Sequence, residues 1–147
     1  MSIIVENRKI KFEYFIEEVL EAGIVLLGSE VKSIRENKIN IIDGFITLKK
    51  GEPYLLNVNI AQYNKTFIAE KHDPLRDRKL LLNKSQIKKF FGKLSQKGMT
   101  IVPLNFHTTR GKIKVDIALV KGKKLHDKRE TIKERDLARS ARKFTDL

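Results

Sequence analysis

Three segments in which apolar and polar residues alternate constrain the fold of this chain more than any other feature. Their apolar positions are 56, 58 and 60, then 102, 104 and 106, and finally 113, 115, 117 and 119. A period of two is typical of a β-strand that buries one face, and such strands belong to antiparallel sheets. Glycine-containing turns at 49–52 and 109–112 lie where hairpin connections need them. The pattern therefore predicts a meandering antiparallel sheet.

The N-terminal part of the chain adds two predicted strands, at 12–18 and 23–27. Gly23 begins the second of them, and a glycine at such a position favours a sharp bend or a bulge. Many short strands in one small domain indicate an oligonucleotide-binding-type (OB-type) antiparallel barrel, whose closure would remove the exposed edges. The expected fold class is mainly β, a barrel with flanking helices followed by a basic C-terminal tail.

Two helices are predicted, near 31–37 and 84–97. The shorter one follows Ser29, whose hydroxyl is a common N-cap. The longer one follows Asn83, and Gln86 three residues later completes a capping box. Apolar residues then recur on one face of this helix before Gly98, at Ile87, Phe90, Phe91 and Leu94.

The positive charge of the chain is concentrated in two regions. The formal net charge is +13, yet residues 1–30 are acidic, whereas 61–100 and 121–147 are strongly basic. Clustered Lys and Arg release counterions from a phosphate backbone, so nucleic acid is the leading partner and an anionic membrane surface a weaker one. Residues 121–147 hold few large apolar side chains. The prediction is a barrel over 1–120 and a tail over 121–147.

Composition argues against several other classes of protein. Cysteine is absent, which excludes disulfides and thiolate zinc ligands and makes a cytoplasmic protein the simplest expectation. A signal peptide is not expected, because the N-terminus has neither a basic stretch before an apolar run nor a small-residue cleavage site. A membrane-spanning segment is not expected either, because no apolar run approaches roughly 20 residues. No phosphate-binding loop is present, and His72, His107 and His126 lack metal-ligand spacing. No cofactor, no metal and no catalytic residue is therefore expected.

Two alternatives to a pure RNA binder remain open at this point. A magnesium-dependent RNA nuclease could use a carboxylate cluster of Glu13, Glu17 and Glu21, although solvated strand charges explain these residues more simply. A ribosomal-protein-like structural module would also account for the basic composition. The first would cleave RNA and the second would accompany all ribosomes.

An ordered series of short motifs resembles the SsrA-binding protein family, also called small protein B, from about Asn7 to Arg135. The motifs that carry the resemblance are Asn7-Arg8-Lys9, Glu13-Tyr14-Phe15-Ile16-Glu17-Glu18, Glu21-Ala22-Gly23, Glu30-Val31-Lys32-Ser33, His72-Asp73-Pro74, Arg78-Lys79-Leu80-Leu81-Leu82-Asn83, Lys121-Gly122-Lys123-Lys124 and His126-Asp127-Lys128-Arg129. Single motifs of this kind are weak, but the ordered series is specific. Residues 107–109 depart from it, because a more aromatic or basic hairpin tip is expected there, and the ending 144–147 is less basic than expected.

The resemblance implies a bacterial, monomeric, non-enzymatic protein with an OB-type barrel and flanking helices. Such a protein binds the elbow of the tRNA-like domain of transfer-messenger RNA (tmRNA, or SsrA RNA). With elongation factor Tu and aminoacylated tmRNA it enters ribosomes stalled on truncated mRNA. Translation then resumes on the RNA's own reading frame and adds a degradation tag, the process called trans-translation.

The resemblance also assigns residues to two RNA contacts. The contact with tmRNA is implied for Glu21, Leu81 and Asn83, and four further residues match family positions near the same surface, Glu30, Lys32, Arg78 and Lys79. Tyr14 adds a ring that can stack on a base. The contact with small-subunit rRNA at the decoding centre is implied for Lys121, Lys123, Lys124, His126, Asp127, Lys128 and Arg129. The tail that bears the second group would be disordered when free and helical in the empty mRNA channel. From the residues alone, Leu81 is expected in the core, Tyr14 in the barrel wall and Asn83 at a helix cap.

Overall fold

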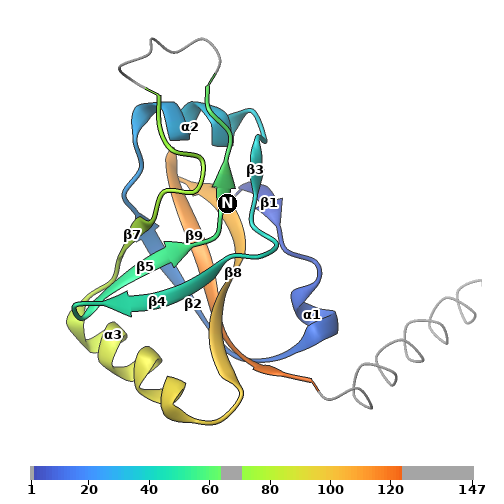
Figure 1. The fold of residues 1–147 in the computed structure, drawn as a ribbon, viewed down its shortest axis with the longest axis vertical. Helices are drawn as coiled ribbons and strands as arrows, with labels where there is room; N and C mark the ends of the chain where they lie inside the picture. The colour runs from blue at the N-terminus through green and yellow to red at the C-terminus, as the bar shows by residue number, and fades with distance from the viewer. Residues whose placement is uncertain (1, 64–70, 124–147) are drawn as a thin grey trace, which may run out of the picture.

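A computed structural model of the chain describes residues 2–63 and 71–123 (Figure 1). Its strands are β1 (Ser2–Glu6), β2 (Tyr14–Ile24), β3 (Ile39–Asn40), β4 (Phe45–Lys49), β5 (Glu52–Leu56), β6 (Asn59–Ile60), β7 (Arg78–Leu81), β8 (Met99–Thr109) and β9 (Lys112–Gly122). Its helices are α1 (Ile10–Glu13), α2 (Gly28–Arg35) and α3 (Lys84–Phe91), and a 3-10 turn (Gly92–Ser95) follows α3. None of the described helices is long and apolar enough to cross a membrane.

The strands form one strongly curved antiparallel sheet in the order β1-β8-β9-β2-β7-β5-β4, beside a small β3–β6 pair. The β4–β5 hairpin folds across β8, and α3 closes one end of the sheet (Figure 1). The mainly β, OB-like fold class is confirmed. The barrel is not closed, however, because β1 and β4 are the two edges of the ladder within the described residues.

Both predicted hairpin turns are present, and each has two residues with positive φ. These are Lys50 (φ 52°) and Gly51 (φ 79°) in the β4–β5 turn, and Arg110 (φ 53°) and Gly111 (φ 77°) in the β8–β9 turn. Two consecutive positive φ angles are typical of the type I′ turn, whose twist matches that of the flanking strands. The turn sequences thus fix the register of both hairpins.

The predicted break in the N-terminal strands is wrong. Residues 14–24 form the single strand β2, and Gly23 lies inside it, paired with Lys114 on one side and Leu81 on the other. The irregularity in β2 falls earlier, between Ile16 and Glu18. A different predicted strand is divided instead, because Asn57 has φ 58° and separates β5 from β6.

The helix predictions hold in outline but differ at the ends. Asn83 caps α3 as expected: its Oδ1 accepts from the Gln86 N–H at 2.8 Å, while the Gln86 Oε1 accepts from the Asn83 N–H at 3.0 Å. The α-helix ends at Phe91 rather than near 97. The first helix begins at Gly28, after an N-cap at Leu27, so Ser29 is not its cap. The Ser29 hydroxyl instead lies 2.8 Å from Nδ1 of His72.

The core lies between the concave face of the sheet and the helices. It collects apolar side chains from β2, β8 and β9 together with residues of α2 and α3, among them Ala22, Ile34, Phe90, Phe91, Ile101, Phe106, Val115, Ile117 and Leu119. Burying this apolar area stabilises the fold by the hydrophobic effect, at about 25 cal/mol per Å². The folded unit also extends slightly past the predicted boundary at residue 120, because β9 continues to Gly122.

Candidate nucleic-acid interface

The outer face of the sheet carries the residues expected to contact RNA. Along β2 the side chains alternate, so that Ala22 is buried in the core while Glu21 lies on the opposite, exposed face. Residues that pair in neighbouring antiparallel strands share a face. The outer face therefore holds one row formed by Leu81, Gly23 and Lys114, and beside it the pair of Glu21 and Asp116.

Gly23 is needed for the close packing of the first row. A Cβ atom at this position would lie 3.1 Å from Cβ of Leu81 and 3.6 Å from Nζ of Lys114. The first distance is shorter than most real Cβ contacts, so any larger residue would displace Leu81. Gly23 is therefore explained by the close approach of neighbouring side chains rather than by a bend or a bulge in the strand.

Leu81 is exposed, with 54% of its surface accessible. The expectation that it belongs to the core is wrong, because in β7 the alternation places its neighbour Leu80 inside at 1% exposure. An exposed leucine beside charged side chains is available to pack against a ribose or a base.

A hollow of about 370 Å³ opens beside this row, between α2, β7 and the β8–β9 hairpin. Three cationic side chains line it, Arg35, Lys112 and Lys114. Arg35 also donates from Nη2 to the carbonyl oxygen of Gly111 at 3.3 Å, which joins α2 to the hairpin tip. The hollow combines positive charge for phosphates with the apolar surface of Leu81.

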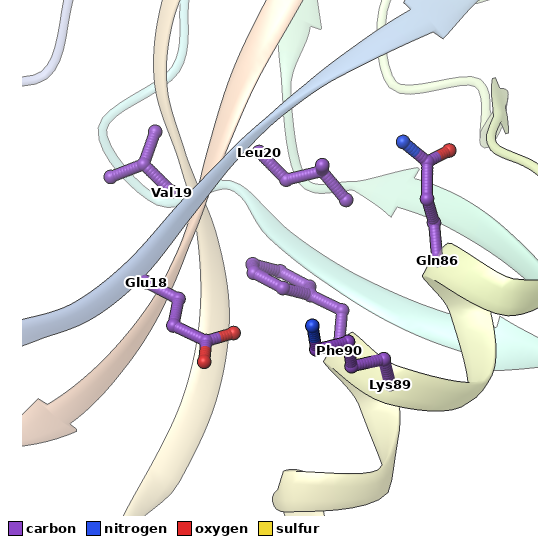
Figure 2. Close-up of a pocket in the computed structure, with 6 residues that line it drawn as sticks. All are labelled: Glu18, Val19, Leu20, Gln86, Lys89 and Phe90. Atoms are coloured by element: carbon purple, nitrogen blue, oxygen red, sulfur yellow. The ribbon is translucent and has the colours of Figure 1, made fainter.

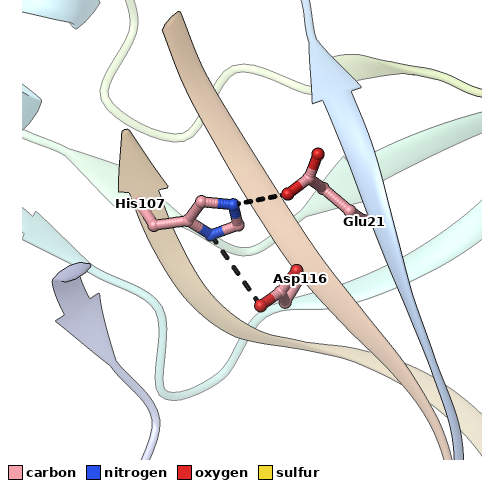
Figure 3. Close-up of side chains that lie close together, drawn as sticks. All are labelled: Glu21, His107 and Asp116. Carbon is pink, nitrogen blue, oxygen red and sulfur yellow. Dashed lines mark hydrogen bonds and ion pairs between the residues drawn. The ribbon is translucent and has the colours of Figure 1, made fainter. Parts of the chain in front are cut away.

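Glu21 belongs to a hydrogen-bonded network that no sequence pattern predicted (Figure 3). Its Oε2 atom lies 2.9 Å from Nε2 of His107, on β8, and that imidazole is fully buried. On the other side of the ring, Nδ1 lies 2.7 Å from Oδ1 of Asn105 and 3.8 Å from Oδ2 of Asp116. Asn105 also donates from Nδ2 to Asp116 at 3.1 Å.

Glu21, His107 and Asp116 could in principle hold a metal ion, since their ligand atoms lie within 4.8 Å of one another. Each nitrogen of the His107 ring, however, already faces a hydrogen-bond acceptor. A histidine must offer a lone pair to bind a metal, so the geometry fits a hydrogen-bonded network better than a metal centre.

The carboxylates proposed for a magnesium nuclease do not come together. Among the described residues, the Glu21, His107 and Asp116 group is the one cluster with metal-ligand proximity, and it contains neither Glu13 nor Glu17. Glu13 ends α1, whereas Glu21 lies well along β2. The nuclease alternative therefore has no assembled site in the described part of the chain.

Two other predicted contact residues, Glu30 and Arg78, are fully buried. Nε of Arg78 donates to Oε2 of Glu30 at 2.6 Å, and Nη2 of Arg76 donates to Oε1 at 2.5 Å. The N–H of Leu27 donates to the same carboxylate at 2.8 Å. Burial at 0% leaves neither Glu30 nor Arg78 any surface for RNA, so the prediction that they bind it directly is corrected to a structural role.

This buried ion pair shifts the pKa of both partners. Burial would raise the pKa of Glu30, but the hydrogen bonds from Arg76, Leu27 and Arg78 and the charge of Arg78 outweigh it, and the pKa lies below its ordinary value. Burial lowers the pKa of Arg78, and Glu30 opposes that shift. Arg78 also donates to the carbonyl oxygen of Val58 at 2.7 Å and to that of Pro74 at 3.1 Å. The pair thereby ties α2, the segment after β5 and β7 together.

The remaining predicted tmRNA contacts are dispersed over the surface. Tyr14 is half-buried at the start of β2, beside a small cluster around Ile10, and thus lies at the far end of the strand from Gly23. Nζ of Lys32 lies 5.4 Å from the centre of the Tyr63 ring on α2's side of the fold, and Nζ of Lys79 pairs with Glu52 at 3.2 Å. The structure therefore brings Glu21, Gly23 and Leu81 together on one face, and Asn83 follows Leu81 by two residues in the sequence.

Residues of the predicted ribosome contact lie partly outside the described residues. Lys121 is exposed at the end of β9. Lys123 donates from Nζ to the carbonyl oxygen of Lys11 at 3.0 Å and lies 5.0 Å from the centre of the Phe15 ring. Lys124, His126, Asp127, Lys128 and Arg129 fall outside the described part of the chain.

A second hollow of about 370 Å³ lies between β2 and α3 (Figure 2). Leu20 and Phe90 form its apolar floor, and Gln86 and Lys89 approach it from the helix. Glu18 lines the other side and pairs with Lys93, which follows α3. This hollow shares no residue with the one beside Gly23.

Comparisons with known proteins agree on one family. Residues 4–146 match the family model described as "SmpB protein". The SsrA-binding protein of Thermosynechococcus vestitus is 50% identical over 135 residues, which cover 92% of this chain and 89% of that one. The SsrA-binding protein of Acholeplasma laidlawii is 54% identical over 139 residues, which cover 95% of this chain and 93% of that one.

A solved structure described as "tmRNA-SmpB: a journey to the center of the bacterial ribosome" has a similar fold. The TM-score is 0.71 at 42% sequence identity, over 89% of this chain and 95% of that chain. The chain is therefore similar to these proteins in both sequence and fold, over nearly its whole length.

Proposed function

Because the chain belongs to the SmpB protein family, we propose that it binds tmRNA and acts with it on the ribosome in trans-translation. The observation that carries the proposal in this chain is the outer-face site, which we define as Glu21, Gly23, Leu81 and Lys114. It places an exposed leucine and a carboxylate, Leu81 and Glu21, for which the family resemblance implies RNA contacts, on one surface with the cation Lys114.

Each part of the outer-face site suits a different group of a folded RNA. Lys114 and the neighbouring Lys112 and Arg35 neutralise phosphates. Leu81 packs against the apolar surface of a ribose or an unstacked base. Glu21 repels phosphate, so its role is to accept hydrogen bonds from base or ribose donors. Together these contacts recognise the shape of a tRNA-like elbow rather than a sequence.

Asn83 extends the site at the start of α3. Its Oδ1 atom is used by the helix cap, where it also accepts from the Ser85 hydroxyl at 2.7 Å. Its amide nitrogen makes no hydrogen bond among residues 2–63 and 71–123, so it is available to RNA. The cap and the RNA contact therefore use different atoms of one side chain.

In the ribosome, we assign the second contact to the basic segment that begins at Lys121. Lys121, Lys123 and Lys124 would meet rRNA phosphates, and His126 would stack on an rRNA base in the empty mRNA channel, with Asp127, Lys128 and Arg129 beside it. Because the apolar content of this segment is too low for a stable free helix, we expect it to fold only on binding. The stalled ribosome and elongation factor Tu with aminoacylated tmRNA are the remaining partners in the proposal, in which the protein is a non-enzymatic, cytoplasmic adaptor.

The direct test is binding of the purified chain to a transcribed tRNA-like domain of tmRNA. If about six phosphates are neutralised, the affinity should fall roughly 10³-fold between 50 and 200 mM salt. A binding titration at several salt concentrations measures this slope. The labelled RNA should stay intact in the presence of magnesium, whereas cleavage would favour a nuclease. Binding to arbitrary duplexes with the same affinity would contradict the proposal.

Leu81→Asp should weaken binding to the tRNA-like domain at least tenfold. The substitution removes an apolar contact and places a negative charge beside RNA phosphates, and either change at the centre of an interface costs about 1–2 kcal/mol. Leu75→Asp is the matched control, because Leu75 has the same 54% exposure but lies outside the outer-face site. Equal affinity of both variants and the unmodified chain would remove Leu81 from the interface.

A further inference from the structure

We infer that His107 is the positioning residue of Glu21: a buried imidazolium that holds the Glu21 carboxylate in the orientation in which it meets RNA. The inference rests on the proposed function and extends it to a residue that contacts no RNA itself. It starts from the fact that His107 is 0% exposed and reaches from β8 across β9 to the exposed carboxylate of Glu21 on β2 (Figure 3).

The hydrogen bonds around His107 determine which atoms donate. Asn105 faces Asp116 with Nδ2, as an amide must when its neighbour is a carboxylate, so its Oδ1 faces Nδ1 of His107. That oxygen can only accept, at 2.7 Å. The Glu21 carboxylate on the opposite nitrogen, at 2.9 Å, can also only accept. Both ring nitrogens therefore donate, which a histidine does only in its doubly protonated form.

The surrounding charges favour the same state. The His107 ring faces Glu21 of β2 and, at 3.8 Å, Asp116 of β9. Lys114 of β9 is the residue that pairs with His107 in the sheet. On the β1 side, Ile3 pairs with His107 and Glu6 with Asn105. Glu21 and Asp116 are themselves directly paired across the two strands, and like charges in that position repel. A positive ring between them offsets this repulsion.

Two consequences for RNA binding follow. First, a charge-assisted hydrogen bond fixes the rotamer of an exposed glutamate, which would otherwise sample several conformations. Second, with His107 and Lys114 positive, the charges of the two carboxylates are offset by two cations, so the phosphates on either side of the group that Glu21 contacts are repelled less strongly. Loss of the ring charge leaves two adjacent carboxylates facing the RNA.

The test compares substitutions of His107 in the full chain. His107→Phe keeps a planar ring but removes both donors, and should weaken binding to the tRNA-like domain about tenfold, the size of one charge-assisted hydrogen bond. His107→Gln keeps one neutral donor and should lose less. His72→Phe is the control, because His72 is the other buried histidine of the described residues and its ring nitrogens face Ser29 and the Ile60 carbonyl, neither of which belongs to the outer-face site. Circular dichroism confirms folding at the temperature of the titration.

A double-mutant cycle separates positioning from a merely structural effect. In a Glu21→Gln background, His107→Phe should cost less than about twofold in affinity, since the carboxylate it positions is gone. An undiminished tenfold loss in that background would overturn the inference, as would unchanged affinity of His107→Phe alone. If the unmodified chain does not bind the tRNA-like domain at all, the proposed function fails instead.

Nitrogen-15 NMR of the unmodified protein reports the state of the ring directly. The imidazole of His107 should show two protonated nitrogens, and the loss of that signal in His107→Gln should assign it. A His107 ring with one lone-pair nitrogen would overturn the inference.

Discussion

Replacing Glu30 with glutamine should lower the free energy of unfolding by about 3 kcal/mol or more, which lowers Tm by roughly 10 °C. The substitution preserves the volume of the side chain but removes its charge. Arg78, which is fully buried, then keeps a positive charge but loses the buried carboxylate that is hydrogen-bonded to it. Breaking a buried ion pair on one side is costly for this reason, although the pair itself need not be strongly stabilising.

Glu52→Gln is the matched control for this experiment. Glu52 also pairs with a cation of β7, Lys79, at 3.2 Å, but its side chain is 50% exposed. Exposed pairs contribute about 0–1 kcal/mol, so this variant should unfold close to the unmodified chain. Urea unfolding followed by circular dichroism measures both. Equal losses in the two variants would contradict the structural role assigned to Glu30.

Glu30 should also make a contribution to the free energy of unfolding that is lost in acid. Its folded pKa lies below the ordinary value of 4.5, so its contribution to stability is fully present above that value and is lost as the pH falls through the lowered pKa. The Glu30→Gln variant lacks this pH-dependent contribution. The difference in stability between the two chains should therefore shrink in strongly acidic solution.

Deleting the residues after Lys124 should abolish tagging while leaving affinity for the tRNA-like domain within about twofold. The outer-face site remains complete in the truncated chain, and β9 ends earlier, at Gly122, so no sheet hydrogen bond of the described fold is removed. The residues assigned to the decoding centre, from His126 to Arg129, are lost. The two contacts thus belong to separate segments of one chain.

A reconstituted translation reaction with a truncated mRNA measures tagging, and a parallel titration measures RNA affinity. The full chain is the reference for tagging. A chain of the same length whose residues after Lys124 lack their basic side chains should not tag. Loss of RNA affinity together with tagging would refute this division of roles. Recovery of the protein with all ribosomes, stalled or not, would favour a structural ribosomal component.

The elements that the sequence predicts well are those set by local chemistry. The type I′ turns require residues that tolerate positive φ, and the α3 cap needs Asn83 and Gln86 three residues apart, so both can be recognised without a structure. The family resemblance likewise depends on ordered motifs. The alternating strand patterns gave the fold class in the same way, and the family motifs indicated the region of the RNA contact.

The features that the sequence did not predict depend on long-range pairing. Leu80, Leu81 and Leu82 are consecutive leucines, and only the register of β7 against β2 shows that the second is exposed. Glu30 and Arg78 are charged residues that are usually solvated, and their burial follows from a contact across 48 positions. His107 meets Glu21 across 86 positions, at a place where the sequence departs from the family pattern.

Because β2 is continuous, it sets the distance between the outer-face site and the start of the C-terminal segment. Gly23 lies near one end of this eleven-residue strand, and at the other end the backbone N–H of Lys123 donates to Glu13 at 2.9 Å. A strand of that length spans roughly 30 Å. Because this strand pairs with β9 along almost its whole length, and also with β7 at Gly23 and Ile24, its two ends are held at a fixed separation. A segment that starts after Lys123 therefore begins at a fixed distance from an RNA bound at Gly23.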